Sequence, residues 1–169
     1  MATWSGTRKK LEEEYLAQSL RGRVHYFCTT YKKSHDREGR AAILVDGREV
    51  LKGNYYNLWQ KWDILPHDKP ISPWQTFLKP SAMTLQEGIF DERTFYAAFN
   101  EFDNQSIEAS LGSPNLLVRI FAILDRRVGK RRLEALWEDL SREGGILQDF
   151  YFLRLDAEGL KPGKVFREK

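Results

Sequence analysis

Apolar residues at helical spacing near the N-terminus predict a first helix over Gly6–Leu20. Four large side chains share one broad side of this segment: Leu11, Tyr15, Leu16 and Leu20. Ser5 and Thr7 are suitable capping residues. The cations Arg8–Lys10 fall in the predicted first turn, where they oppose the helix dipole, so we expect packing on the rest of the protein to hold this helix.

A period of two replaces the helical period after Gly22 and predicts three strands, at Arg23–Lys33, Arg40–Val45 and Arg48–Leu51. In the first strand, alternate residues point to opposite faces, with His25, Phe27, Thr29 and Tyr31 on one and Val24, Tyr26, Cys28 and Thr30 on the other. Asp46–Gly47 favours a type I′ turn, in which both residues have positive φ. The pattern therefore predicts a three-stranded antiparallel meander.

The remaining chain is predicted to be mainly helical. A short helix from Asn54 ends at Pro66, and a connection with four prolines runs to Pro80. Helices are then expected at Asp91–Asp103, Gln105–Leu111, Pro114–Val128, Lys130–Glu143 and Ile146–Leu155. Ser113 before Pro114 is a start signal. The helix after Gly129 shows an apolar stripe that we assign to the core: Leu133, Leu136, Trp137 and Leu140.

These elements predict an α+β protein with one domain over residues 1–169. Residues 1–53 form the helix and meander, 54–83 an aromatic and proline-rich connection, 84–158 the helical part with four to five helices, and 159–169 a loose tail.

The composition fits a folded cytoplasmic protein. Apolar residues make up 41% of the chain, which is too much for a disordered segment. A single cysteine, Cys28, is expected as a small buried hydrophobe and cannot form an internal disulfide. No stretch approaches the about 20 apolar residues of a membrane span, and the N-terminus has no signal-peptide pattern. We expect no membrane partner, no cofactor and no metal site.

The densest basic feature lies around Gly129 and is the main candidate binding site: Arg119, Arg126, Arg127, Lys130, Arg131 and Arg132. Several cations on one side, beside a helix start, favour an anionic partner. The alternative is a solvated rim that is partly paired with Asp125, Glu134 and Glu138. The segment is not a phosphate-binding P-loop, because the upstream glycine and the following Ser or Thr are missing.

A second candidate site is His35 with Asp36 in the first hairpin loop, together with His25 on the preceding strand. Histidine beside a carboxylate suits general acid–base chemistry. A polar turn explains the same residues without catalysis, and the spacing of the histidines does not match a metal site.

Aromatic residues after the meander form a third feature: Tyr55, Tyr56, Trp59, Trp62 and Trp74. Such side chains serve as anchors at interfaces, but more often they fill a core. Trp59 and Trp74 are the candidates for a self-association patch.

Three stretches together resemble a family of small, uncharacterised bacterial cytosolic proteins. They are Trp4–Leu11, then Ser34–Asp36 with Gly39–Ala41 and Val45–Val50, and finally Leu124–Leu133. The resemblance implies a bacterial cytoplasmic origin and a shared fold. It transfers no activity, cofactor or catalytic residue.

The sequence leaves three functions open. The first is a non-enzymatic binding protein whose basic segment meets RNA, DNA or an acidic protein surface. The second is a small hydrolase, with phosphodiesters as a candidate substrate class, that uses His35 or His25 with Asp36. The third is a structural subunit that self-associates through Trp59 and Trp74.

Overall fold

The computed structural model describes residues 3–31, 33, 39–54, 82–161 and 166. An N-terminal helix, α1 (Trp4–Lys9), continues into a π-helical stretch (Lys10–Tyr15) and is followed by a 3₁₀ turn (Gln18–Leu20). The strands are β1 (Val24–Thr30), β2 (Gly39–Val45) and β3 (Arg48–Asn54). The helices that follow are α4 (Ala82–Gln86), α5 (Glu92–Asp103), α6 (Ile107–Leu111), α7 (Leu116–Ile123), α8 (Lys130–Ala135), α9 (Trp137–Leu140) and α10 (Gly145–Ala157). The predicted α+β class is confirmed.

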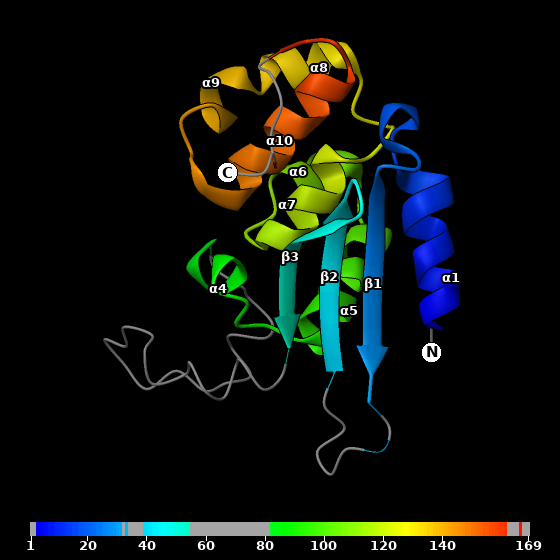
Figure 1. Cartoon of the computed structure of the whole chain (residues 1–169). Coiled ribbons are helices and arrows are strands. Elements are labelled where there is room, and N and C mark those ends of the chain that lie inside the picture. The colour runs from blue at the N-terminus through cyan, green and yellow to red at the C-terminus, as the bar shows by residue number, and fades with distance from the viewer. Residues whose placement is uncertain (1–2, 32, 34–38, 55–81, 162–165, 167–169) are drawn as a thin grey trace.

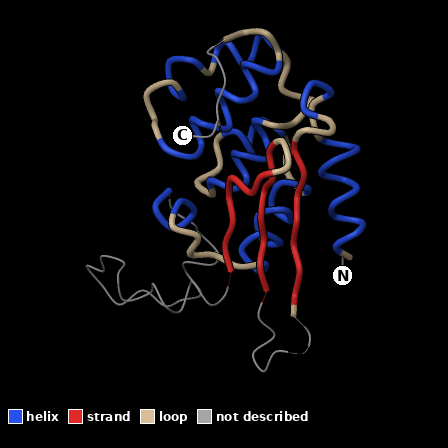
Figure 2. Tube along the Cα trace, viewed as in Figure 1, coloured by secondary structure: helices blue, strands red, loops and turns tan. Residues whose placement is uncertain are grey.

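The three strands form an antiparallel sheet in the order β1-β2-β3 (Figure 2). Val24 pairs with Val45 across β1 and β2, and a bulge lies between Ile43 and Leu44 of β2. Asp46 and Gly47 both have positive φ, at 50° and 81°, as the predicted type I′ turn requires. The predicted meander is therefore confirmed, with β3 three residues longer than expected.

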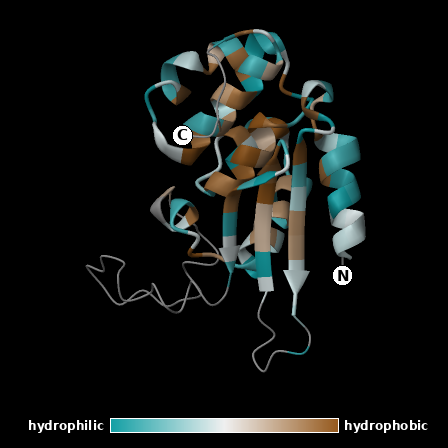
Figure 3. Cartoon of the chain, in the orientation of Figure 1, coloured by the Kyte–Doolittle hydropathy of each residue, from teal (hydrophilic) through white to brown (hydrophobic). Residues whose placement is uncertain are grey.

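One face of the sheet carries the core. Figure 1 shows α1 beside β1 and α5 behind the sheet, while α8, α9 and α10 lie together beyond its end. The ribbon is coloured as hydrophobic along much of α7, next to the sheet (Figure 3). The Phe121 ring on α7 meets Phe95 at 5.3 Å, Phe102 at 5.6 Å and Tyr26 at 5.7 Å between centroids. These tilted and edge-on contacts join α5, α7 and β1 into one core.

The first helix ends earlier than the sequence predicts. Helical structure runs from Trp4 to Tyr15, rather than from Gly6 to Leu20, and its N-cap is Thr3, whose hydroxyl accepts from Gly6 N–H at 3.2 Å. Leu16 leaves the helix with ψ of 134° and forms a β-bridge with Asp125. A backbone pairing with a distant loop, which no local pattern reveals, therefore ends the helix.

That loop, residues 124–128, is organised by Arg154 of α10. The Arg154 side chain is 3% exposed, and its guanidinium donates to the carbonyl oxygens of Ile123, Asp125 and Val128, each at 2.8 Å. Its Nε also donates to Glu158 at 2.9 Å. These hydrogen bonds satisfy the Ile123 and Val128 carbonyls where α7 stops, and they give a second donor to Asp125 O, which also accepts from Val128 N–H at 3.1 Å.

The prediction of one helix over Pro114–Val128 is wrong at both ends. α7 spans Leu116–Ile123, and Asn115 is its N-cap, accepting from Leu117 N–H at 3.1 Å. Ser113, the predicted cap, instead accepts from Asn115 N–H at 3.1 Å and donates to Glu101. The chain leaves the helix after Ile123 because its carbonyls are held by Arg154.

Other boundaries moved less. The predicted helix Lys130–Glu143 is two short helices, α8 and α9, which meet at Leu136. The last helix is confirmed and extends to Ala157. The helix predicted from Asn54 and the connection to Pro80 lie outside the described residues. Within the described residues, no helix combines the length and apolar character needed to cross a membrane.

The start of α5 buries two adjacent carboxyl groups. Asp91 caps the helix, accepting from Arg93 N–H at 2.9 Å and Thr94 N–H at 3.3 Å, and Glu92 follows it at 5% exposure. A Cβ on Gly39 of β2 would lie 2.0 Å from Glu92 Oε2, so only glycine allows this approach. Burial, with the neighbouring Asp91 charge, raises the pKa of Glu92 to about 7.

We expect Arg154→Met to lower the free energy of unfolding by about 3–5 kcal/mol, because it removes the guanidinium donors from three carbonyl oxygens and leaves Glu158 without its cation. Urea unfolding followed by circular dichroism measures the loss. Arg142→Met is the control: Arg142 is 79% exposed, so its removal should cost less than about 0.5 kcal/mol. A loss at Arg154 no larger than at Arg142 would show that the loop holds without the guanidinium.

The raised pKa of Glu92 predicts a pH-dependent stability. Its folded-state pKa of about 7 exceeds the ordinary 4.5, so the stabilisation is complete below pH 4.5 and is lost as pH rises through 7. Relative to Glu92→Gln, the wild type should lose on the order of 2–3 kcal/mol between about pH 4 and pH 8. Unfolding curves at several pH values measure this difference, with exposed Glu13→Gln as the control that should show no such trend. A pH-independent difference for Glu92→Gln contradicts the expectation.

Candidate functional site

The basic segment lies at the corner where α7, the loop 124–128 and α8 meet. The loop is fixed from both ends of the chain. Arg154 holds its carbonyls, and Ala17 N–H donates to Leu124 O at 2.9 Å. Arg126 N–H donates to Tyr15 O at 2.7 Å. The backbone that presents these cations is therefore well positioned.

Arg127 belongs to the fold. Its Nη2 lies 2.8 Å from Oδ2 of Asp125, a carboxylate with no exposed surface, and its backbone N–H donates to the same carboxylate at 2.7 Å. The guanidinium also lies over the rings of Tyr15 and Phe102, at 4.9 and 5.6 Å from their centroids. The hydrogen bond to Asp125 raises the pKa of Arg127 above its ordinary value. This cation is tied to the core.

Two further cations of the segment are paired on the surface. Arg119 makes a two-point contact with Glu143 at 3.0 and 3.2 Å and donates to Leu111 O at 3.2 Å. Arg132 donates to Glu108 at 3.0 Å. Arg119 and Arg132 therefore belong to a partly paired rim, which was the alternative interpretation of the basic segment. Their partners, Glu143 and Glu108, are not among the carboxylates predicted from the sequence.

Arg126, Lys130 and Arg131 remain, and we call them the exposed cations. All three are exposed, and none forms an ion pair with another residue in the described part of the chain. The charge of Lys130 acts on Glu158. Burial disfavours the ionised form of Glu158, but hydrogen bonds from Ser19 and Arg154, together with the charge of Lys130, leave the pKa of Glu158 below its ordinary value. Three of the six predicted cations are thus available to a partner.

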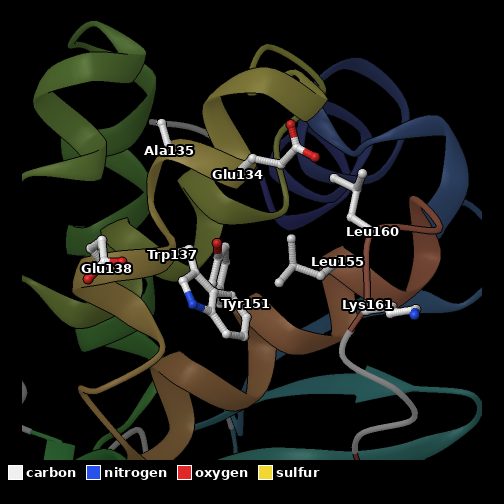
Figure 4. A pocket seen from close by; sticks show the side chains of 8 residues that line it. All are labelled: Glu134, Ala135, Trp137, Glu138, Tyr151, Leu155, Leu160 and Lys161. Atoms are coloured by element: carbon white, nitrogen blue, oxygen red, sulfur yellow. The ribbon is translucent and has the colours of Figure 1, made fainter.

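A cavity of about 520 Å³ lies between α8, α9 and the end of α10 (Figure 4), and its first lining residues, Glu134 and Ala135, follow Lys130 and Arg131 by one helical turn. Its lining consists of Glu134, Ala135, Trp137, Glu138, Tyr151, Leu155, Leu160 and Lys161. The assignment of Trp137 to the core is wrong, because its side chain is 43% exposed. Leu133 and Leu140 of the same stripe are buried. The helix assignment is interrupted at Leu136, directly before Trp137, and neither this interruption nor the cavity can be predicted from the spacing of the apolar residues.

His25 is oriented by an unexpected partner. Its Nδ1 lies 3.3 Å from Glu12 Oε2, in the π-helical stretch, and the side chain is 41% exposed. Glu12 also accepts from Tyr26 N–H at 2.8 Å and Arg8 Nε at 3.1 Å. His35 and Asp36, the other candidates for catalysis, lie outside the described residues. Among residues that are described, no group of three or more His, Cys, Asp or Glu side chains is placed to hold a metal.

The other candidates add no chemistry. Cys28 is buried on the core face of β1, and burial raises the pKa of its thiol to about 12, so it is not a reactive thiolate. The predicted aromatic surface of Tyr55, Tyr56, Trp59, Trp62 and Trp74 lies outside the described residues.

Comparison with known proteins places the chain in a family without assigning a reaction. Neither the search of curated proteins nor that of solved structures gives a significant match. Residues 3–155 match the SF0329 protein family, a span that runs from the cap of α1 into α10 and includes the basic corner and most of the cavity lining. The chain therefore belongs to the SF0329 protein family.

Proposed function

We propose that the protein is a non-enzymatic binding module whose partner is an acidic protein surface that contacts Arg126, Lys130 and Arg131. The observation that carries the proposal is the division of the basic segment. Arg119, Arg127 and Arg132 are paired by carboxylates of the chain, whereas the exposed cations have no such partner in the described part. Exposed charges on a positioned backbone favour complementary charges on a partner.

The pattern of charge favours protein over nucleic acid. Glu108 lies beside Arg132, and Glu134 and Glu138 line the cavity next to the cations. A phosphate backbone carries negative charge at every nucleotide, so these carboxylates would repel it along any extended track. A protein surface can instead place acids opposite the cations and other groups opposite the carboxylates. RNA or DNA binding is therefore the outcome that competes with our proposal.

The pairing of His25 with Glu12 supports a second, weaker candidate function. A carboxylate that fixes one ring nitrogen leaves the other available as a general base, which is the arrangement used by many hydrolases. In that function, a small hydrolase uses His35 or His25 with Asp36. We favour binding, because among the described side chains no group of three or more His, Cys, Asp or Glu residues is placed to hold a metal beside His25. Self-association through Trp59 and Trp74 stays a prediction.

Our proposal places the protein in a bacterial cytoplasm. Its one cysteine is buried with a raised thiol pKa, which suits a reducing compartment where no disulfide is needed. The absence of a membrane-crossing helix among the described elements is compatible with this location.

Photo-crosslinking from position 130 tests the partner class. With a benzophenone amino acid in place of Lys130, crosslinking in the native cells should yield a protein adduct rather than an RNA or DNA adduct. Arg126→Glu with Arg131→Glu should lower that adduct at least about tenfold, because two attractions become repulsions. Mass spectrometry and nuclease treatment identify the adduct.

A double variant with the same charge change controls for net charge. Lys9→Glu with Lys52→Glu reverses two exposed cations on α1 and β3 and should leave the adduct intact. A nucleic-acid adduct would replace our proposal by the competing one. If both double variants lose the adduct equally, or if position 130 gives none, the exposed cations are not the contact surface.

A further inference from the structure

The cavity beside the exposed cations has an aromatic wall that the fold leaves open. Trp137 stacks on Phe152, with ring centroids 6.0 Å apart and planes 22° apart. Phe152 does not line the cavity, whereas Trp137 does and is 43% exposed, so the stack on Phe152 leaves indole surface available on the cavity side. Tyr151 lies beside it in Figure 4, and its hydroxyl is already engaged with the Leu133 carbonyl. The wall thus offers aromatic surface with few unused polar atoms.

Two carboxylates flank this wall on the α8–α9 side. Glu134 and Glu138 both line the cavity, four residues apart. Glu134 has no ion-pair partner within the described residues, and Glu138 meets only Arg142, in a contact where both side chains are more than 70% exposed. Glu134 and Tyr151 line the same cavity. Burial, and next the charge of Glu134, raise the pKa of Tyr151 to about 12. Exposed pairs such as Glu138–Arg142 exchange readily for a better partner.

We propose that this cavity binds an arginine side chain of the protein partner. A guanidinium is planar and weakly hydrated, so it can stack on the open indole face while its N–H groups donate to the carboxylates of Glu134 and Glu138. The aliphatic stem then lies along Leu155 and Leu160 on the other side of the cavity. Lysine fits less well, because its ammonium is strongly hydrated and does not stack.

The volume of the cavity and the charge of Lys161 indicate which partner groups would lie next to that arginine. A volume of about 520 Å³ exceeds one side chain and leaves room for the adjacent peptide. Lys161 lies across the view from Glu138 in Figure 4 and would repel a second cation, but it suits a carboxylate near the arginine. The same partner would place further acids against the exposed cations, since Lys130 precedes Glu134 by one helical turn. In this respect the inference rests on the proposed function.

A minimal probe tests the cavity independently of any partner. We would titrate N-acetyl-arginine-N-methylamide into the full-length protein and follow the Trp137 indole N–H signal by NMR, assigned with a Trp137→Phe variant. The shift should saturate with a Kd in the low millimolar range. The norleucine analogue, which keeps the stem without the charge, should bind at least about fivefold more weakly, and the lysine analogue should fall between them.

Matched variants identify the residues responsible. Glu134→Gln and Glu138→Gln should each weaken the arginine probe about threefold or more, and Trp137→Leu, followed by backbone signals, should abolish binding. Asp139→Asn removes an exposed carboxylate of α9 that does not line the cavity, so the affinity should stay within about twofold. The spectra themselves report whether each variant is folded.

Each contrary result has a defined meaning. Equal affinity for the arginine and norleucine probes would leave a merely apolar cavity and overturn the proposal. An Asp139→Asn effect as large as that of Glu134→Gln would show unspecific attraction, which also overturns it, as does the lack of any saturable shift. If the arginine probe binds but position 130 gives no crosslink, the cavity proposal stands and the proposed contact through the exposed cations fails. If position 130 gives a protein crosslink but the arginine probe does not bind, the contact proposal stands and the cavity proposal fails.

Discussion

The architecture depends on one buried guanidinium. A charged group at 3% exposure is tolerated only when its donors are satisfied, and Arg154 meets this condition by binding three carbonyl oxygens and Glu158. Burial lowers the pKa of Arg154, but the attached carbonyls and carboxylate keep the charged form in place. Because all three carbonyls belong to residues 123–128, α10 dictates where α7 ends. The loop so formed is also the one that holds the first helix.

This arrangement explains the most distinctive stretch of the sequence, Leu124–Leu133. Its residues divide by environment. Leu124, Asp125, Val128 and Leu133 are buried, and Arg127 is bound to Asp125 over two aromatic rings, so these five build the junction. The exposed cations occupy the positions between them. A run that reads as one basic patch is therefore a structural motif with three outward charges inserted into it.

The parts of the fold that sequence predicts well are those fixed locally. The meander follows from alternation and from Asp46–Gly47, since both act within a few residues. Helix ends were missed where distant groups decide them: Leu16 leaves its helix to pair with Asp125, and α7 stops where Arg154 reaches it. For the site, the sequence located the cations but not their pairing, because Glu108 and Glu143 lie 24 residues from their partners.

Trp137 shows why the cavity escaped prediction and why it matters for function. Its spacing from Leu133 and Leu140 predicts a core position, but the indole lies at the edge of the buried stripe, at the junction of α8 and α9, and is 43% exposed. Glu134 and Glu138 line the same cavity, one and two helical turns beyond Lys130. A surface with cations, carboxylates and an aromatic wall at helical spacing is poorly matched to a uniformly charged polymer. It discriminates among partners by the order of their charges, and a wrong order leaves like charges in contact.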